Sequence, residues 1–430
     1  MKKRLLSLFV VILLTLYALP AFSSEFSGEV EIFSSYNLST KDLDYGTRVD
    51  LDYTTSLGDS GYFFQTGLLL KYQDENNFRP LRVKEAYLQG IQAPWEEVDF
   101  KLGLLQLTWG ASDVMSPADL VNPRPFSTSL SKEAMEDKIP IPALDAEWYF
   151  SDFWSLEFLY QPSFVANFIP ASAEEQMFAG QLLSQFSSLS PETLTLSVEK
   201  EYPAVGFASP IWAVRARGMI SDIDVAFSFY HGYFLSAYPR FTEVTVAADA
   251  SSTVHSVWGF PERSVLGLEF QGELSALEGS TFRGDLALVF PEEWEHQVAI
   301  HYPDGSVETF TDSTFASPYL KASLGVDYTT ENDWYFSLNY LLGNPFEEGR
   351  DVSSYIYFYT DYTTEDGKWK PMLTSVLSLE DGSMVNMLGA TYKPRDNWEI
   401  SFSISLSSGA KESRLGSLND GVFLNVDYSF

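Results

Sequence analysis

Apolar and polar residues alternate along the last part of the chain. Between Trp398 and Leu406 every second residue is apolar, and the residues between them are polar. The same period of two returns between Val422 and Phe430, where Phe423 is the one apolar residue in a polar position. Because a β-strand points successive side chains to opposite faces, each segment is predicted to be a strand with one apolar and one polar face.

Earlier segments of the chain show the same alternation. Their apolar positions are separated by charged or hydroxyl-bearing residues, as strands with two different faces require. In two segments, Leu81 to Ile91 and Tyr355 to Tyr362, neither set of alternate positions is cleanly apolar, and either a β-bulge or a partner strand from an inward loop would explain this. The regular segments are 49–53, 98–104, 154–160, 225–229, 266–270, 286–290, 320–326 and 334–340.

Short turn signals, each followed by an aromatic or apolar residue, divide the chain. Asp, Asn, Ser and Gly tolerate tight-turn geometry, and aromatic residues just beyond them suit a membrane interface. Two strands and a longer polar loop lie between consecutive turns. The sequence therefore predicts an all-β fold, a transmembrane antiparallel up-and-down β-barrel of about 18 strands, or about 16, with short periplasmic turns and long extracellular loops. The turns are 58–61, 151–152, 221–222, 331–333, 365–367 and 395–397, with 94–97 and 276–280 as less regular examples.

The first residues have the pattern of a secretory signal peptide. Lys2, Lys3 and Arg4 precede an apolar run from Leu5 to Leu19, and a small-x-small cleavage site ends at Ser23. The run is shorter than the ~20 residues of a spanning helix, and no comparable run follows. We therefore expect a signal peptide over 1–23, a single barrel domain over 24–430, and a location in the bacterial outer membrane.

Composition narrows the classes of function. The formal net charge of −32 excludes nucleic-acid binding through the overall field of the chain. Cysteine is absent, so disulfides and thiolate metal sites are excluded. Aromatic residues make up 16% of the chain, which suits interfacial girdles. The mean hydropathy of −0.08 excludes a helical membrane protein but not a barrel, in which half of each strand is polar.

If the apolar positions face lipid, the alternate positions face the interior of the barrel. A charged side chain facing lipid at mid-depth costs about 2 to 4 kcal/mol, so charged residues at these positions must meet water or one another. One interpretation is a ladder of ion pairs, and the other is a pore wall that attracts anions, with Arg215 and Arg217 as its clearest sign. The predicted pore-lining residues are Arg48, Asp50, Lys101, Arg215, Arg217, Arg263, Arg283, Asp285 and Lys321.

The predicted external loops carry most of the acidic excess, which either keeps the surface solvated or binds divalent cations. Ser172 and Glu175 form a capping box, and apolar residues from Met177 to Phe186 recur at helical spacing. This loop is therefore predicted to hold an amphipathic helix. Residues 298–302 and 307–310, joined through a Pro-Asp-Gly turn, are predicted to form a hairpin in another loop.

The stretch from Val83 to Pro123 contains specific sequence motifs in addition to the alternation of a barrel strand. A Lys-Glu-Ala-Tyr strand at 84–87 is followed by a Trp-Gly-Ala-Ser-Asp turn at 109–113 and by Asn-Pro at 122–123. These motifs resemble a largely uncharacterised family of bacterial outer-membrane barrels related to alginate-export porins. The resemblance implies an outer-membrane pore or export channel, although the mixed charges of the predicted wall do not favour alginate. It also implies a constriction loop folded in at the outer mouth, formed by Trp109, Gly110, Ser112, Asp113, Asp119, Asn122 and Pro123.

The alternating strand that ends on Phe430 resembles the closing strand of bacterial outer-membrane barrels. In those proteins the terminal aromatic residue is the signal for the outer-membrane assembly machinery. The resemblance therefore implies this machinery as a partner, together with outer-membrane lipid.

Catalysis finds little support in the sequence. The four histidines lie at predicted strand ends or in loops and show no metal-ligand spacing. His255-Ser256 lies in a predicted polar loop, Thr242 to Gly259, where a surface pair is the simpler interpretation. We expect no enzyme, no cofactor and no metal site.

The expected function is a passive, porin-like outer-membrane channel for small polar or anionic solutes. About 18 strands enclose a cylinder too wide for side chains alone to fill. A non-conducting structural or adhesive barrel and an exporter of an anionic polysaccharide are the alternatives. The solute, an oligomeric state and the degree of closure by inward loops are left open.

Overall fold

The computed structural model describes residues 24–58, 61–73, 81–112, 114–125, 137–169, 194–249, 251–274, 277–344, 347–349, 351–410, 412–416, 418 and 420–430. The predicted signal peptide over 1–23, the predicted amphipathic helix around Met177 and the constriction-loop residue Asp113 lie outside the described residues. No helix in these ranges is long and apolar enough to cross a membrane.

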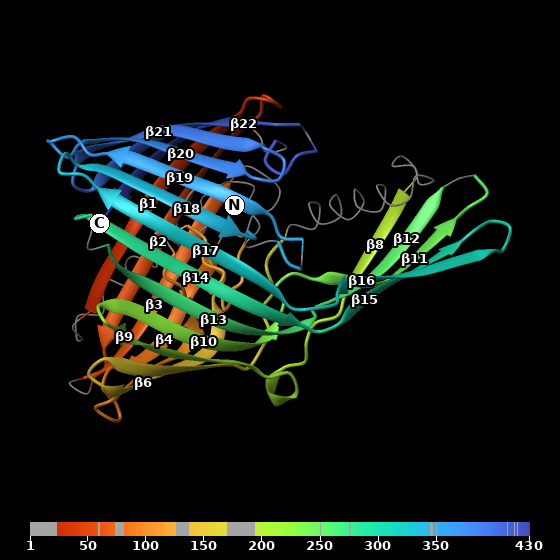
Figure 1. Cartoon of the computed structure of the whole chain (residues 1–430), viewed down its shortest axis with the longest axis horizontal. Helices are drawn as coiled ribbons and strands as arrows, with labels where there is room; N and C mark the ends of the chain where they lie inside the picture. The colour runs from red at the N-terminus through yellow and green to blue at the C-terminus, as the bar shows by residue number, and fades with distance from the viewer. Residues whose placement is uncertain are drawn as a thin grey trace, which may run out of the picture.

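Eighteen strands form one closed antiparallel barrel (Figure 1). The first strand pairs with both the second and the last, for example through Val30 with Val49 and with Tyr428, which closes the sheet on itself. The predicted fold class and strand number are therefore confirmed. The barrel strands are β1 (Ser24–Asn37), β2 (Leu43–Ser56), β3 (Tyr62–Gln73), β4 (Leu81–Gly90), β5 (Val98–Leu105), β6 (Ile141–Ser151), β7 (Trp154–Gln161), β9 (Ile211–Ile220), β10 (Ile223–Tyr233), β13 (Glu262–Glu273), β14 (Ser280–Pro291), β17 (Tyr319–Thr329), β18 (Trp334–Leu342), β19 (Ser354–Tyr362), β20 (Trp369–Ser378), β21 (Met384–Arg395), β22 (Trp398–Ser408) and β23 (Gly421–Ser429).

The predicted short turns join neighbouring barrel strands at one end of the barrel. Ser221 and Asp222, between β9 and β10, both have positive φ, 49° and 67°, which is the twist that a two-residue hairpin turn needs. At the other end longer connections occur, among them 106–140 between β5 and β6 and 162–210 between β7 and β9. The barrel therefore has a short-turn end and a long-loop end.

The two faces of the barrel wall differ as the alternation predicts. Asp50, on the inner face of β2, is 9% exposed and lies beside Arg48 and Lys84. On the outer face, large apolar side chains are exposed on strands all around the barrel, and no described part of the chain covers them. Examples are Leu266, Leu288, Leu324, Leu338, Leu388, Phe402 and Leu424.

The two ambiguous segments have different explanations. In β4 the pairing with β3 skips Lys84, because Gly67 pairs with Glu85 and Leu68 with Val83, so this strand contains a β-bulge. β19 pairs regularly on both sides. Its inward-facing Tyr355 is instead buried against residues of inward loops. The β-bulge explanation therefore applies to β4, whereas β19 pairs only with β18 and β20 among the described strands, so a partner strand from an inward loop does not explain it.

A second, five-stranded sheet stands at the long-loop end (Figure 1). The predicted hairpin is confirmed as β15 (Trp294–His301) paired with β16 (Val307–Phe315). The expectation of a polar loop over Thr242 to Gly259 was wrong, because this segment lies mostly in β11 (Tyr238–Val246) and β12 (Ser252–Gly259). β8 (Leu194–Lys200) completes the sheet. We call it the outer sheet, and the prediction of a single barrel domain did not include it.

The main apolar cluster lies inside the barrel. It joins residues of the wall, such as Leu159, Ile211 and Val265, to residues of the connection between β5 and β6, such as Trp109 and Val121. Inward-facing side chains of a wide barrel can be buried only by something that enters the lumen. The cluster therefore shows that this connection folds inward.

Candidate functional site

Residues 106–125, which we call the lumen loop, leave the end of β5 and enter the barrel. Asn122 holds the root of the loop together. Its amide group donates to the carbonyls of Leu105 and Ile139 at 2.9 and 2.8 Å, and its side-chain oxygen accepts from the Leu107 N–H at 2.7 Å. The Pro123 carbonyl accepts from the Ile139 N–H at 2.7 Å. Both limbs of the connection are thus fixed at one point.

A buried charge cluster stiffens the loop above this root. The Lys138 ammonium donates to the Leu107 carbonyl at 2.6 Å and lies 2.8 Å from an Asp119 oxygen. Arg124 contacts the same carboxylate at 2.6 Å. Two cations on one buried carboxylate satisfy charges that would otherwise be costly to bury.

The tip of the loop is held by carboxylates of the opposite wall. The Ala111 and Ser112 N–H groups each donate to Asp285 of β14 at 2.8 Å, and the Gly110 N–H donates to Glu269 of β13 at 2.9 Å. Gly110 has φ 103°, and a Cβ there would overlap the Ser116 hydroxyl, so this position favours glycine. The backbone of the loop therefore replaces water as the partner of buried wall carboxylates.

Trp109 lies against Arg215, one of the two arginines of β9. Its indole N–H donates to Glu157 of β7 at 2.9 Å, and the Arg215 guanidinium lies 5.5 Å from the ring centroid. Arg215 pairs with Glu269, and Arg217 pairs with Glu147. The two differ in exposure, since the side chain of Arg215 is 10% exposed and that of Arg217 is 41% exposed. Of the two interpretations of these arginines, the ion-pair ladder describes the contacts that both make.

The other predicted wall residues also lie on the inner face, next to partners. Arg48 contacts Asp50 at 2.7 Å, and Arg283 contacts Asp327 at 2.6 Å. Lys101 of β5 pairs in register with Asp145 of β6. Each of these three basic positions therefore has a carboxylate on the same or a neighbouring strand.

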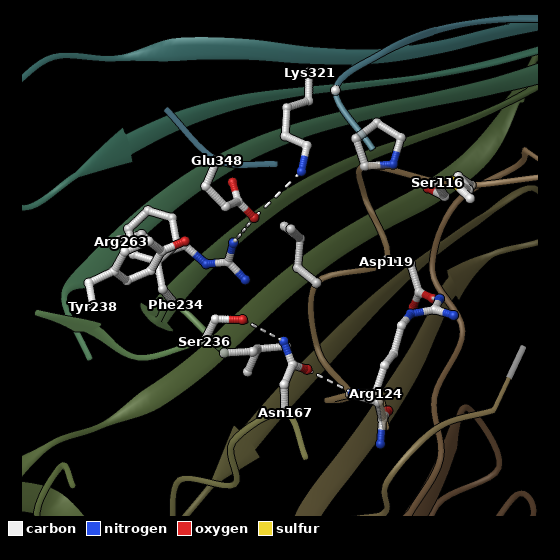
Figure 2. Close-up of a pocket in the computed structure, with 16 residues that line it drawn as sticks. Ser116, Asp119, Arg124, Asn167, Phe234, Ser236, Tyr238, Arg263, Lys321 and Glu348 are labelled. Carbon is white, nitrogen blue, oxygen red and sulfur yellow. Dashed lines mark hydrogen bonds and ion pairs between the residues drawn. The ribbon is translucent and has the colours of Figure 1, made fainter. Parts of the chain in front are cut away.

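A pocket of about 60 Å³ lies on the long-loop side of the lumen loop. Figure 2 shows Glu348 between Arg263 and Lys321, with both cations 3.5 Å from one carboxylate oxygen. Across the pocket, the Asn167 amide donates to the Ser236 hydroxyl at 3.0 Å and its oxygen accepts from the Arg124 N–H at 2.8 Å. These polar groups of the pocket wall thus already have hydrogen-bond or ion-pair partners within the protein.

A larger cavity of about 330 Å³ lies between the lumen loop and the barrel strands β4, β5, β6, β7 and β9. Acidic and basic side chains line it together, among them Lys101, Asp145 and Arg217. Such a mixture keeps water in the cavity, because desolvated charges are costly.

Three loops are tied together at the long-loop end. Arg414 contacts Glu347 at 2.8 Å and Glu380 at 3.1 Å. Its N–H donates to Asp381 at 2.8 Å. Hydrogen bonds from the Ser383 hydroxyl and from backbone N–H groups hold the pKa of Asp381 well below its usual range. The rim of the barrel is therefore restrained by charged contacts at ordinary pH.

Several residues of the site were not predicted. Glu157 occupies an inward position of β7, so the alternation that identified Arg215 would also have identified it. Lys138 follows a run of acidic residues in a connecting segment, and nothing in its sequence neighbourhood indicates its contacts. Glu348 lies in the loop after β18, where no periodic pattern assigns a direction.

The His255-Ser256 pair does not form a catalytic arrangement. Neighbouring residues of a strand point to opposite faces, so the two side chains diverge. The Ser256 hydroxyl lies 2.8 Å from that of Thr242 and accepts from the Trp258 indole at 2.9 Å. In the described part of the chain no group of three or more His, Cys, Asp or Glu side chains could hold a metal ion.

Comparisons with solved structures find bacterial porins. A triple mutant of a Rhodopseudomonas blastica porin is 10% identical, with a TM-score of 0.44, and the match covers 95% of this chain and 100% of that one. Salmonella typhi OmpF in complex with daunomycin is 9% identical, with a TM-score of 0.43, and covers 95% and 97%. No functionally curated protein matches the chain.

A comparison with protein-family models matches more than half of the chain. Residues 35–288 match the model of a family described as "Protein of unknown function (DUF1302)". The matched range includes the strand and loop motifs between Val83 and Pro123 that carried the resemblance. A relationship to alginate-export channels is not part of this match. Since the match spans more than half of the sequence, the chain belongs to the DUF1302 family.

Proposed function

We propose that the chain is a passive outer-membrane channel for small polar solutes. The observation that carries the proposal is the closed barrel with exposed apolar side chains outside and charged, paired side chains inside. Exposed apolar surface on this scale suits hydrocarbon, and a charged interior suits water. A channel of this kind needs no cofactor and no chemical step, and the solute gradient drives transport.

Aromatic residues at the short-turn end support a membrane location. Trp334 stacks on Tyr362 with 5.1 Å between ring centroids, and Trp369 stacks on Tyr392 at 4.5 Å. Both pairs sit where a strand leaves a short turn. Tryptophan and tyrosine gather at the interface of membrane and water, where one end of the ring is apolar and the other is wet.

A test of the membrane location is to place a charge on the outer face. Leu324, in the middle of β17, is 43% exposed. The variant Leu324→Arg should lower the free energy of unfolding in lipid vesicles by about 2 to 4 kcal/mol, because the guanidinium would enter hydrocarbon. Denaturant titration measures the change. The control Ser403→Arg lies on the inner face of β22 and should cost much less; equal costs would place both residues in the same solvent.

Conduction is tested in a planar bilayer. Purified, folded protein should give stepwise current increments as single barrels insert. A silent bilayer would instead support a non-conducting structural barrel, which the apolar cluster between lumen loop and wall favours as the second candidate. We do not propose polysaccharide export, because each predicted basic residue of the wall has a carboxylate near it, on a strand or, for Arg263 and Lys321, in the loop after β18.

A preference for anions would depend mainly on Arg217. Among the predicted wall arginines its side chain is the most exposed, at 41%, and it borders the cavity of about 330 Å³. The variant Arg217→Glu should shift the reversal potential under a KCl gradient toward cation preference, because it reverses a charge that passing ions can approach. An unchanged reversal potential would remove Arg217 from the conducting wall.

Recognition of Phe430 by the assembly machinery belongs to the same proposal. In the folded barrel the Phe430 ring packs against Phe26 with 5.9 Å between centroids, and its N–H donates to the Gly28 carbonyl at 2.9 Å. These contacts support a role of Phe430 at the closing seam of the barrel.

A further inference from the structure

The charged part of the barrel wall lies beneath the lumen loop. Asp285 is fully buried, and Glu269, Lys321 and Arg215 are between 3% and 8% exposed. The loop covers this wall in two ways. Its backbone N–H groups donate to Asp285 and Glu269, and its Trp109 ring lies over Arg215. A solute in the lumen therefore meets little of this charge.

The wall formed by β18 to β22 is different. We define the neutral sector as the inward-facing residues of these strands between the lumen loop and two ion pairs near the short-turn end. These ion pairs are Lys370 with Asp361 and Lys393 with Glu399, each 3.0 Å apart. Pairing registers assign the inward positions, and none of the described ones within the sector is charged. The lumen loop leaves the middle of this wall uncovered, since Tyr357, Tyr359 and Ser403 remain partly exposed.

Tyrosines form a row along the neutral sector. Tyr355, Tyr357 and Tyr359 occupy successive inward positions of β19, so their Cα atoms rise by about 6.6 Å per step along the strand. Tyr335 of β18 extends the row, with 5.9 Å between its ring centroid and that of Tyr359. Tyr355 is buried at the lumen loop. The row therefore runs from the constricted level of the barrel toward the short-turn end.

Hydroxyl groups and thioethers flank this row. On β22 the inward positions from 401 to 407 are all serine. Between β19 and β22, Met387 and Met372 face inward, and Met372 lies over Gly389. The sector thus offers aromatic and apolar surface for packing and hydroxyl groups for hydrogen bonds. It offers no charge that could replace the water around an ion.

We propose that the neutral sector binds a neutral, hydroxyl-rich solute of the saccharide class on its way through the barrel. A sugar ring has apolar C–H faces, which pack on the tyrosine row, and equatorial hydroxyls, which exchange hydrogen bonds with the serines. A charged solute would lose hydration without a compensating partner here. The inference rests on the proposed channel function and adds the class of solute and the strands that select it.

Maltotriose is a suitable probe, and its binding is measured in two independent ways. Calorimetry on the intact protein in detergent reports binding without any need for conduction. Block of the ion current in a planar bilayer reports binding inside the conducting path. A trimer of galacturonic acid, of similar size but charged, should bind at least about 10-fold more weakly, because the sector holds no counter-charge.

The variants Tyr357→Ala and Tyr359→Ala should each weaken maltotriose binding by about 3- to 10-fold, the effect of losing one aromatic contact. Phe358→Ala is the matched control, because Phe358 lies between them on the same strand and points to the outer face. It should leave binding unchanged. Tyr357→Phe keeps the ring and should retain most of the affinity, which separates stacking from loss of fold.

The outcomes distinguish this inference from the proposed function. Conduction without maltotriose binding, or equal binding of the two trimers, overturns the inference and leaves the channel. Maltotriose binding that depends on Tyr357 and Tyr359 supports the saccharide site, and a silent bilayer with the same protein would overturn the channel proposal and, with it, the passage of the solute through the barrel. Equal losses in both tyrosine variants and in Phe358→Ala would also overturn it, since they would indicate a general change of fold.

Discussion

Replacing Asp285 with alanine should raise the single-channel conductance and make the current noisier. Asp285 is fully buried and accepts the N–H groups of Ala111 and Ser112 at 2.8 Å. Hydrogen bonds to a charged group contribute about 1.5 to 3 kcal/mol each, so the variant removes much of the free energy that holds the tip of the lumen loop on β14. A loop released from the wall would sample other positions in the lumen. Conductance and open-channel noise in a planar bilayer measure this.

Asp327→Ala is the matched control for this experiment. Asp327 is an inward-facing, 4% exposed carboxylate on the neighbouring β17, but its partner is Arg283 of β14 and not the lumen loop. It should lower stability without changing the open-channel current. The assignment of Asp285 as the anchor of the loop would be contradicted if both variants changed conductance alike.

Arg215→Leu should be the most destabilising substitution in the wall. The guanidinium lies against Glu269 and 3.5 Å from Glu157, and all three residues are at least nine-tenths buried. Removing one partner of a buried charge cluster leaves the others uncompensated, which typically costs about 3 to 5 kcal/mol. The free energy of unfolding in vesicles, from denaturant titration, should fall by this amount. Arg217→Leu should cost clearly less, because that side chain is 41% exposed and water can replace it.

A double variant tests the cause of this loss. When Arg215→Leu is combined with Glu269→Gln, a neutral amide replaces one of the carboxylates that had lost its cation, so part of the stability should return. A double variant as unstable as the sum of its single variants would show that Arg215 acts through packing on Trp109 rather than through charge. The ring contact of 5.5 Å makes this a real alternative.

The barrel could be predicted because its chemistry repeats every two residues. In β22 the alternation from Trp398 to Ser407 assigns each side chain to the apolar or the polar face. The pairing registers with β21 and β23 place the same residues on the same faces. Phe423 breaks the alternation because it faces inward, toward the seam, where it pairs with Ser35. Strand number followed from turn residues such as Ser221 and Asp222, whose backbone geometry few other residues tolerate.

The contacts of the lumen loop could not be predicted in this way. Its tip is held by backbone N–H groups, which every residue other than proline possesses, so the partner of Asp285 has no signature in the sequence. The contact from Ala111 to Asp285 spans 174 residues. The motifs around Trp109 indicated an inward loop, but not that the loop would lie over the charged wall.

The outer sheet was missed for a related reason. β11 and β15 pair in parallel although β13 and β14 of the barrel separate them along the chain. Val254, Ser256 and Trp258 are buried and do alternate with less buried residues in β12, but this signal lies between polar segments that resemble loops. Pairing between distant loops is a property of the folded barrel rather than of any short stretch.

The outer sheet draws its strands from three separate excursions of the chain, those after β7, β10 and β14. Parallel pairings between β8 and β12 and between β11 and β15 join these excursions into a single sheet. A cut within one excursion would therefore leave its strand attached by backbone hydrogen bonds. An antibody selected against the folded protein would recognise an epitope that no single peptide from this region reproduces.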